Sequence, residues 1–338
     1  MIVYLLRRLF LLAFVFIALS ILAFSLGYLF PGNPLQNFSG LRYFTAEQTE
    51  ILTQYYRLND GYIQQYIAYL SRIFTGDWGL SLTSQQSLLA EIRSLMPATL
   101  ELTAYALLIS FVIGIPLGIV AAIKPEGVIS RFISGLAVTG YSIPIFWWAL
   151  LLIMIFSLGL GWLPTAGRIG VLYEVNQTSG FMLLDILMSD SQYKAEAFLD
   201  AVRHLLLPTI VLATFPTTVM VRFTRDSMLE VWEQSYIKTA RAKGLNRAQV
   251  LYRHGLRNAL LPVIRQIGLQ FSTLITLAMI TEVIFSWPGI GRWLIDSIYQ
   301  RNYPAIQAGL LVISTTVISV NMLTEILHTL FNPLARKR

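Results

Sequence analysis

The residues best suited to chemistry in this 338-residue chain form one charged stretch, Tyr236 to Ile264. It reads YIKTARAKGLNRAQVLYRHGLRNALLPVI and carries basic side chains along most of its length. Basic helices bind anionic lipid headgroups, and short helical segments also dock into grooves on partner proteins. The stretch therefore predicts a binding surface rather than a reaction centre, and both kinds of partner remain open at this point.

Helix signals in and just before this stretch predict two helices joined by a tight turn. The segment 227–230, Ser-Met-Leu-Glu, fits a capping box, so a helix is expected to begin there and to reach Lys243. Gly244 then suits the left-handed position that ends many helices. The segment 246–249, Asn-Arg-Ala-Gln, fits a second helix start, and that helix is expected to end or bend near Pro262. Residues 226–262 should therefore form a helical hairpin with Gly244 at its apex.

Catalytic and metal chemistry have little support elsewhere in the sequence. The chain has no cysteine, which excludes thiolate nucleophiles, thiolate metal ligands and disulfides. His204, His254 and His328 are far apart, and no H-E-x-x-H or G-x-S-x-G motif is present. No lysine follows a glycine, as a phosphate-binding loop requires. No catalytic residue, metal site or cofactor is predicted in this chain, and His254 is expected to support the hairpin by a hydrogen bond to its apex.

The composition places the hairpin in an integral membrane protein. Hydrophobic residues make up 55% of the chain and charged residues 13%, and the mean hydropathy is +0.62. Six apolar segments approach the ~20 residues that a helix needs to cross ~30 Å of hydrocarbon. They are Leu9–Leu29, Ala98–Ile123, Phe132–Leu160, Leu205–Val221, Pro262–Phe285 and Ala305–Leu327. The first is expected to be a retained span rather than a signal peptide, because it is long and lacks a cleavage site. Pro144 predicts a kink in the third.

The distribution of charge predicts the orientation of these spans. With the amino terminus inside, the internal segments hold 16 basic residues (Lys and Arg) and four acidic residues. The external segments hold nine basic and eleven acidic residues. Cytoplasmic loops carry the excess of basic residues, so both termini and the hairpin are expected in the cytoplasm. The basic balance thus reflects topology and not nucleic-acid binding. We expect one membrane domain over 1–338, with a first span at 1–29, an external helical cap at 30–96 and a five-span core at 97–338.

A line of polar residues in the fifth predicted span could face a route through the membrane. Its members are Gln266, Gln270, Thr273 and Thr276, which share or adjoin one helical face, and Glu282 near the outer end. A charge near the bilayer centre costs at least ~2.5 kcal/mol by insertion scales, so such residues usually have a function. Hydrogen bonding between helices uses the same residue types at the same spacing. A pathway role and a packing role therefore remain alternatives.

The segment from Thr239 to Pro262 resembles the EAA loop of binding-protein-dependent ABC importer permeases. The resemblance lies in the small residues before Gly244, in His254 and in the closing Leu-Pro. Further segments are similar to dipeptide, oligopeptide and nickel permeases: FTGDWGLSL (74–82), MPATLEL (96–102), YSIPIFWWALLL (141–152), GWLPTAGR (161–168) and ITEVIFSWPGIGRWLIDSI (280–298). Within that branch the chain is most similar to the permeases of Sap systems, which are associated with resistance to antimicrobial peptides and, in some descriptions, with putrescine.

This resemblance implies an all-α permease of the type I importer fold, with six spans in the bacterial inner membrane. In the family the EAA loop sits on a separate ATPase subunit. The implied coupling residues are Lys238, Thr239, Ala240, Arg241, Lys243, Gly244, Leu245, Asn246 and His254. Lys238 stands where the family has a glutamate, so a salt bridge through that glutamate is not expected here. Glu282 occurs in this branch whatever the substrate, which favours packing over substrate contact.

The resemblance also implies partners and cargo. The implied partners are a second homologous permease, two nucleotide-binding subunits that hold ATP and Mg²⁺, a periplasmic solute-binding protein, and membrane lipid. The implied cargo is peptides or a small polycation such as putrescine, moved in a direction that the sequence does not specify.

Two other classes of function can be compared with this one. An ion-gradient-driven transporter would use Glu101, Glu282 and Glu325 as relay groups, but it would not need a long cytoplasmic hairpin. A membrane-embedded enzyme would need a nucleophile, a base or a metal site, and the sequence offers no such set. An ATP-driven permease is therefore the leading hypothesis.

Overall fold

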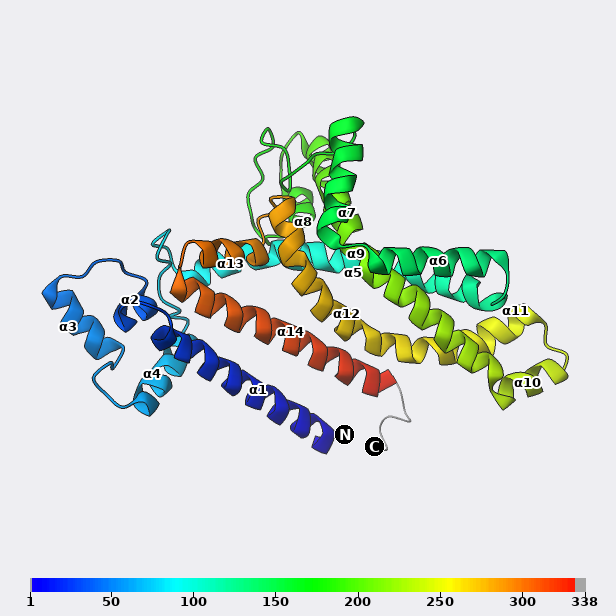
Figure 1. Cartoon of the computed structure of the whole chain (residues 1–338), viewed down its shortest axis with the longest axis horizontal. Coiled ribbons are helices and arrows are strands. Elements are labelled where there is room, and N and C mark those ends of the chain that lie inside the picture. Colours follow the sequence, from blue (N-terminus) through cyan, green and yellow to red (C-terminus); the bar gives the residue numbers. More distant parts are fainter. Residues whose placement is uncertain (1, 332–338) are drawn as a thin grey trace. The chain divides into compact units, whose positions relative to one another are not determined.

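The computed structural model describes residues 2–331, without the side chains at 2–5, 241, 247, 248, 257, 261, 264, 265, 267, 328, 330 and 331. Helices are the main secondary structure of the described residues, which include no named strand, in agreement with the all-α prediction (Figure 1). Their contacts group the chain into two compact units, each of which is described by itself. The expectation of one permease domain stays a prediction.

The first unit comprises Met1–Thr99, Gln177–Phe181 and Pro288–Ser319. Its helices are α1 (Ile2–Leu29), α2 (Pro34–Ser39), α3 (Ala46–Tyr55), α4 (Tyr62–Thr75), the start of α5 (Leu88–Ile123), α13 (Ile290–Tyr299) and the first part of α14 (Tyr303–Phe331). Four buried aromatic residues, Phe24, Phe38, Tyr56 and Tyr69, form one cluster that joins α1 to the short helices after it. Residues 30–75 therefore form short helices that pack together and on α1, and the predicted external cap over 30–96 stays a prediction.

The second unit comprises Leu100–Asn176, Met182–Trp287 and Val320–Arg338. After α5, its helices are α6 (Val128–Ser142), α7 (Ile145–Leu152), a π-helix (Ile153–Gly159), α8 (Met182–Met188), α9 (Lys194–Glu233), α10 (Ser235–Ala242), α11 (Arg247–Val250), a second π-helix (Leu251–Gly255) and α12 (Leu256–Ile284). The long helix α9 packs along α12 and also contacts α6, α7 and α8. It is the central helix of this unit.

Close packing of α5 on α9 depends on two glycines spaced four residues apart. A Cβ atom at Gly114 would lie 2.6 Å from Cβ of Met220, and one at Gly118 would lie 2.7 Å from Cβ of Thr224. Small residues at this spacing let membrane helices approach closely, since packing rather than the hydrophobic effect holds such helices together. Larger side chains at either glycine would force the two helices apart.

Four helices among the described residues are long and apolar enough to cross a membrane: Leu6–Leu29, Leu88–Ile123, Lys194–Glu233 and Tyr303–Leu327. Val128–Ser142 and Ile145–Gly159 pass the same test together but meet at a bend of 103°. The third predicted span, Phe132–Leu160, is therefore a broken pair and not one continuous helix. Pro144 has no N–H to donate and forces Ile143 into an extended conformation, with ψ of 124°, so the predicted kink is confirmed and is sharp.

The fifth predicted span, Pro262–Phe285, lies within α12. Its apolar portion, Gly268–Ile284, is shorter than a usual span. By length and composition the described helices thus supply four spans, or five if the bent pair counts as one. The six-span count is compatible with this arrangement and stays a prediction.

Candidate functional site

The charged stretch folds as a hairpin between α9 and α12, but its first helix begins later than predicted. The predicted start at Ser227 is wrong, because α9 runs from Lys194 to Glu233 without a break. The Ser227 hydroxyl donates instead to the carbonyl of Ala259 in α12, at 2.9 Å. The chain breaks at Gln234, whose extended ψ of 144° separates α9 from α10. A serine inside a helix can match a capping motif while its hydroxyl bonds elsewhere.

The turn at the apex agrees with the sequence. Gly244 has a φ of +80°, the left-handed conformation predicted for it. The N–H of Leu245 donates to the carbonyl of Ala240 at 3.4 Å, which is the long bond of a Schellman motif. The backbone N–H of Asn246 donates to the Gln249 side chain at 3.0 Å, and the reverse bond is 2.8 Å. The second helix therefore begins with the predicted reciprocal cap.

The second helix does not end at Pro262, so of the predicted end or bend at this residue the end is wrong. Pro262 lies inside α12, which continues to Ile284. The irregular element lies earlier, where residues Leu251–Gly255 form a π-helix. A π-helix shifts the helical register by inserting a residue, and such elements are frequent at functional sites. A 3.6-residue period therefore does not relate the faces of residues before Leu251 to those of residues after Gly255, whereas spacings within α12 remain those of a regular helix.

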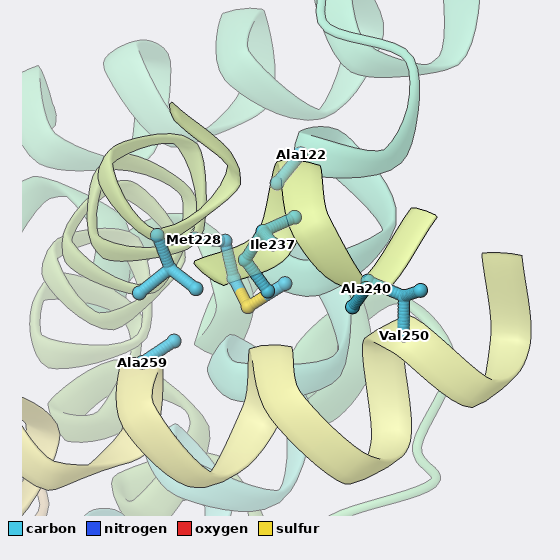
Figure 2. Close-up of a cluster of buried hydrophobic side chains, with 7 residues drawn as sticks. Ala122, Met228, Ile237, Ala240, Val250 and Ala259 are labelled. Atoms are coloured by element: carbon cyan, nitrogen blue, oxygen red, sulfur yellow. The ribbon is translucent and has the colours of Figure 1, made fainter. Parts of the chain in front are cut away.

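A buried hydrophobic cluster attaches the hairpin to the helices on either side of it. It consists of Ala122 at the end of α5, Met228 and Val231 in α9, Ile237 and Ala240 in α10, Val250 in α11 and Ala259 in α12. Figure 2 shows six of these side chains pointing into one space between the helices. Ile237, Val250, Met228 and Ala259 have no solvent exposure. The hairpin is thus packed as part of the second unit and does not hang from it as a loose loop.

The outer side of the hairpin presents a basic surface. The exposed coupling candidates are Lys238, Thr239, Lys243, Gly244 and Asn246. Ala240 and Leu245 instead pack in or against the buried hydrophobic cluster and support the hairpin from within. The side chain of Arg241 lies outside the described part of the chain. No Asp or Glu occurs between residues 234 and 262, so the described lysines meet no acidic neighbour within this stretch of sequence. This surface suits an acidic partner.

The base of the hairpin contains residues that the sequence did not single out. The amide of Asn258 donates to the Tyr236 hydroxyl at 2.9 Å and to the His254 carbonyl at 3.1 Å, which joins α10 to α12. Within the described contacts of the hairpin, His254 acts through this carbonyl, and the predicted bond from its ring to the apex is not seen. Tyr252 is 72% exposed on the π-helix. Its exposure has no signal in the sequence because the π-helix changes the register.

The polar line on α12 separates into exposed and buried members. Thr276 is exposed, Gln266 and Thr273 are half-buried, and Gln270 and Glu282 are buried. The Thr273 and Thr276 hydroxyls donate to carbonyls one turn earlier in their own helix. The Gln270 side-chain oxygen is buried without a hydrogen-bond partner in the described part of the chain. These five residues therefore do not form one continuous exposed face in this chain.

The neighbouring Ser272 has a packing role. Its hydroxyl accepts a hydrogen bond of 2.8 Å from Asn321 in the second-unit part of α14. This is the helix-to-helix bond that the packing interpretation of the polar line predicts. Glu282 is 0% exposed, which likewise agrees with packing rather than contact with a solute.

Comparison with known protein families identifies matching models for both parts of the chain. Residues 114–337 match the model described as "Binding-protein-dependent transport system inner membrane component". Residues 1–103 match the model for the N-terminal part of such membrane components. Among solved structures, a chain of the MetNI methionine ABC transporter in an inward-facing conformation has a TM-score of 0.52 at 16% identity, covering 70% of this chain and 93% of that chain.

Similar curated proteins match over almost their full length. The di/tripeptide transport system permease protein DppB of Pseudomonas aeruginosa is 46% identical, covering 98% of this chain and 97% of the relative. The peptide transport system permease protein SapB of Salmonella typhimurium is 43% identical over 100% of this chain and 98% of the relative. The putrescine export system permease protein SapB of Escherichia coli is 42% identical with the same coverage. The chain therefore belongs to the family of binding-protein-dependent transport system inner membrane components, as one of its multi-pass permease subunits.

Proposed function

We propose that the 226–262 hairpin of this permease subunit couples ATP binding on separate ATPase subunits to movement of its membrane helices. The observation that carries the proposal is the combination of an exposed basic tip with a buried hydrophobic cluster at the base. The tip bears Lys238, Lys243 and the open apex at Gly244. The base is packed against α5, α9 and α12. A rigid element of this kind can transmit a displacement, whereas a flexible loop would absorb it.

The mechanism follows from the packing. ATP binding would bring two ATPase subunits together and displace the hairpin seated on each permease. Because Ile237 and Val250 pack on Met228 and Ala259, displacement of the hairpin moves the inner ends of α9 and α12 with it. The bond from Ser227 to Ala259 holds those two helices together during the movement. The chain transmits energy in this proposal, and hydrolysis with Mg²⁺ takes place on the partners.

The proposed assembly contains one copy of this chain, a second homologous permease, two ATPase subunits and a periplasmic solute-binding protein. The chain lies in the bacterial inner membrane with both termini in the cytoplasm, because that orientation places the basic segments inside. The exposed hydrophobic face of α1, which includes Leu6, Phe10 and Phe14, contacts lipid or a neighbouring subunit in this arrangement. The exposed part of the polar line on α12, Thr276 with Gln266 and Thr273 beside it, is our candidate for the wall of the pathway.

Short peptides are the proposed substrate class. Relatives at 46% and 43% identity carry names of di/tripeptide and peptide transport systems. The second candidate is putrescine, because a relative at 42% identity is named as a putrescine export permease. Competition between a labelled dipeptide and putrescine in uptake and efflux assays distinguishes these substrates and the direction of transport.

The ion-gradient alternative is not favoured. Glu101, one of its three relay candidates, forms a buried ion pair with Arg168, so its carboxylate is already engaged within the chain. Glu282 is inaccessible within this chain. A relay needs carboxylates that exchange protons with water on both sides of the membrane.

Purification of the tagged chain from its native membrane in mild detergent tests the proposal. The expected result is a complex with a second permease and nucleotide-binding subunits, whose ATP hydrolysis depends on an intact hairpin. A chain that purifies alone and moves solute in liposomes under an ion gradient would overturn the proposal.

A further inference from the structure

A buried ion pair in the second unit has no role in the coupling proposal. Arg168, from the predicted external segment, contacts the carboxylate of Glu101 in α5, and their side chains are 4% and 2% exposed. The same carboxylate accepts backbone N–H groups from Met182 and Leu183, both at 3.3 Å. These are the first residues of α8. Glu101 therefore joins α5 to Arg168 and to the beginning of α8.

The turn that carries Arg168 makes three further contacts, two with the segment just after α12 and one with α9. The N–H of Gly167 donates to the carbonyl of Phe285, just after α12, at 2.9 Å. The Arg168 guanidinium lies 5.4 Å from the ring centre of Trp287. The N–H of Gly170 donates to the carboxylate of Asp200 in α9 at 2.6 Å. Residues 167–170, which we name the Arg168 turn, thus connect the outer parts of α5, α8, α9 and α12.

Three separate sequence segments supply this cluster. Glu101 lies in MPATLEL, Arg168 ends GWLPTAGR, and Phe285 and Trp287 lie in ITEVIFSWPGIGRWLIDSI. The coupling proposal gives none of these segments a task, because its hairpin lies elsewhere in the sequence. Their residues meet at one buried place in the second unit. An ion pair, a cation–π contact and several hydrogen bonds to backbone groups occur together here. Together they fix the positions of these helix ends relative to one another.

We propose that Glu101 and Arg168 are positioning residues that hold the outer ends of α5, α8, α9 and α12 together as one rigid block during transport. A buried ion pair adds little net stability compared with apolar residues of the same size, because both charges lose their hydration. The ion pair instead fixes geometry, because its hydrogen bonds form only when each donor and acceptor has a particular position and orientation. Removal of either charge leaves the other uncompensated in a buried site, so the block loosens there first.

This inference rests on the proposed function for its mechanical meaning. Displacement of the hairpin at the inner side would pull on α9 and α12. If their outer ends are fixed together with α5, the second unit tilts as a body, and the segment Phe285–Trp287 at the end of α12 moves with it. If the ends were free, the same displacement would spread the helices within the unit, and less of it would reach the outer side.

Distance measurements between two spin labels test the block directly. The chain has no native cysteine, so Leu187→Cys in α8 and Val283→Cys in α12 are the only labelling sites that this chain contributes, and the complex without these two cysteines gives the background of its partners. Both positions are partly exposed, at 52% and 42%, and neither lies in the cluster. The complex purified through this chain is measured by pulsed electron spin resonance without nucleotide, and with ATP and vanadate. Glu101→Gln removes the charge, Arg168→Lys is a milder variant that keeps it, and Glu196→Gln changes an exposed carboxylate in α9 as the control.

The expected distance distribution is narrow and unchanged by ATP and vanadate in the unmodified background and in Glu196→Gln. Glu101→Gln is expected to broaden it, and Arg168→Lys to broaden it less, while the yield of the complex is retained. A distance that shifts with nucleotide before any substitution would overturn the inference, as would an unchanged distribution in both cluster variants. Absence of ATPase subunits from the purified complex would refute the proposed function instead, and the labels would still report on the block.

Discussion

The buried base of the hairpin gives a prediction whose size can be worked out from the structure. Ile237 is 0% exposed and lies in α10, between the exposed tip and the α9 and α12 residues of the cluster. Ile237→Ala removes three side-chain carbons from a closed site. Such substitutions in packed cores cost about 2 to 5 kcal/mol, because transfer energy is lost and a cavity remains. Taking about 3 kcal/mol, the population of the locally opened hairpin should rise roughly 150-fold.

Native-state hydrogen exchange measures this population. Amides of residues 235–255 in the purified complex should lose protection by about two orders of magnitude in Ile237→Ala, while amides in α6 keep theirs. Thr239→Ala in the same helix is the matched control, since Thr239 is exposed and its substitution should change stability by less than about 0.5 kcal/mol. Transport should fall with Ile237→Ala although the tip retains every charge. Unchanged exchange and unchanged transport in Ile237→Ala would refute the claim that the base holds the hairpin rigid.

Three further predictions concern the apex of the hairpin, the charge beside it and the short helices at residues 30–75. Gly244→Val should strain a residue with φ of +80° by about 1 to 3 kcal/mol and abolish copurification of the ATPase, while the chain still inserts into the membrane. Gly161→Val is the control, because Gly161 is also left-handed and has open space around it. Equal loss of copurification in both variants would contradict a specific role for Gly244. The double variant Lys238→Glu, Lys243→Glu should weaken association with the ATPase, and the difference from the unmodified chain should shrink as salt is added. Binding measured at two ionic strengths checks this, and unchanged affinity would argue against an acidic partner. Burial raises the pKa of Tyr56 to about 12, so only the unfolded state ionises between pH 10 and 12 and stability falls across that window. Tyr56→Phe should flatten this loss in thermal unfolding scans, and an unchanged alkaline slope would refute the assignment.

Local sequence signals predicted the parts of the site that depend on short-range geometry. The left-handed turn at Gly244 is set by that residue and its immediate neighbours. The cap formed by Asn246 and Gln249 joins residues three positions apart. A short sequence motif is therefore enough to predict both features. The break at Pro144 is equally local, because proline restricts its own φ and the conformation of the residue before it. These features agree with the structure for the same physical reason.

Features that depend on distant partners could not be predicted in the same way. Ser227 matches a capping motif but bonds to Ala259, which is 32 residues away. Pro262 is accommodated inside α12. The π-helix at 251–255 shifts the helical register, and no residue type in that segment predicts it. The ion pair of Arg168 with Glu101 joins residues 67 positions apart. Each of these depends on tertiary packing, which a single sequence does not encode in its local pattern.

Photocrosslinking from the hairpin tip in native membranes is the most direct test of coupling. Thr239→Cys, in a chain without other cysteines, carries a benzophenone on the exposed side of α10. The account predicts a crosslink to a nucleotide-binding subunit, identified by mass spectrometry, whose yield changes when ATP and vanadate are added. Crosslinks to lipid alone, with the same yield in both conditions, would contradict it and would indicate that the basic hairpin lies on the membrane surface.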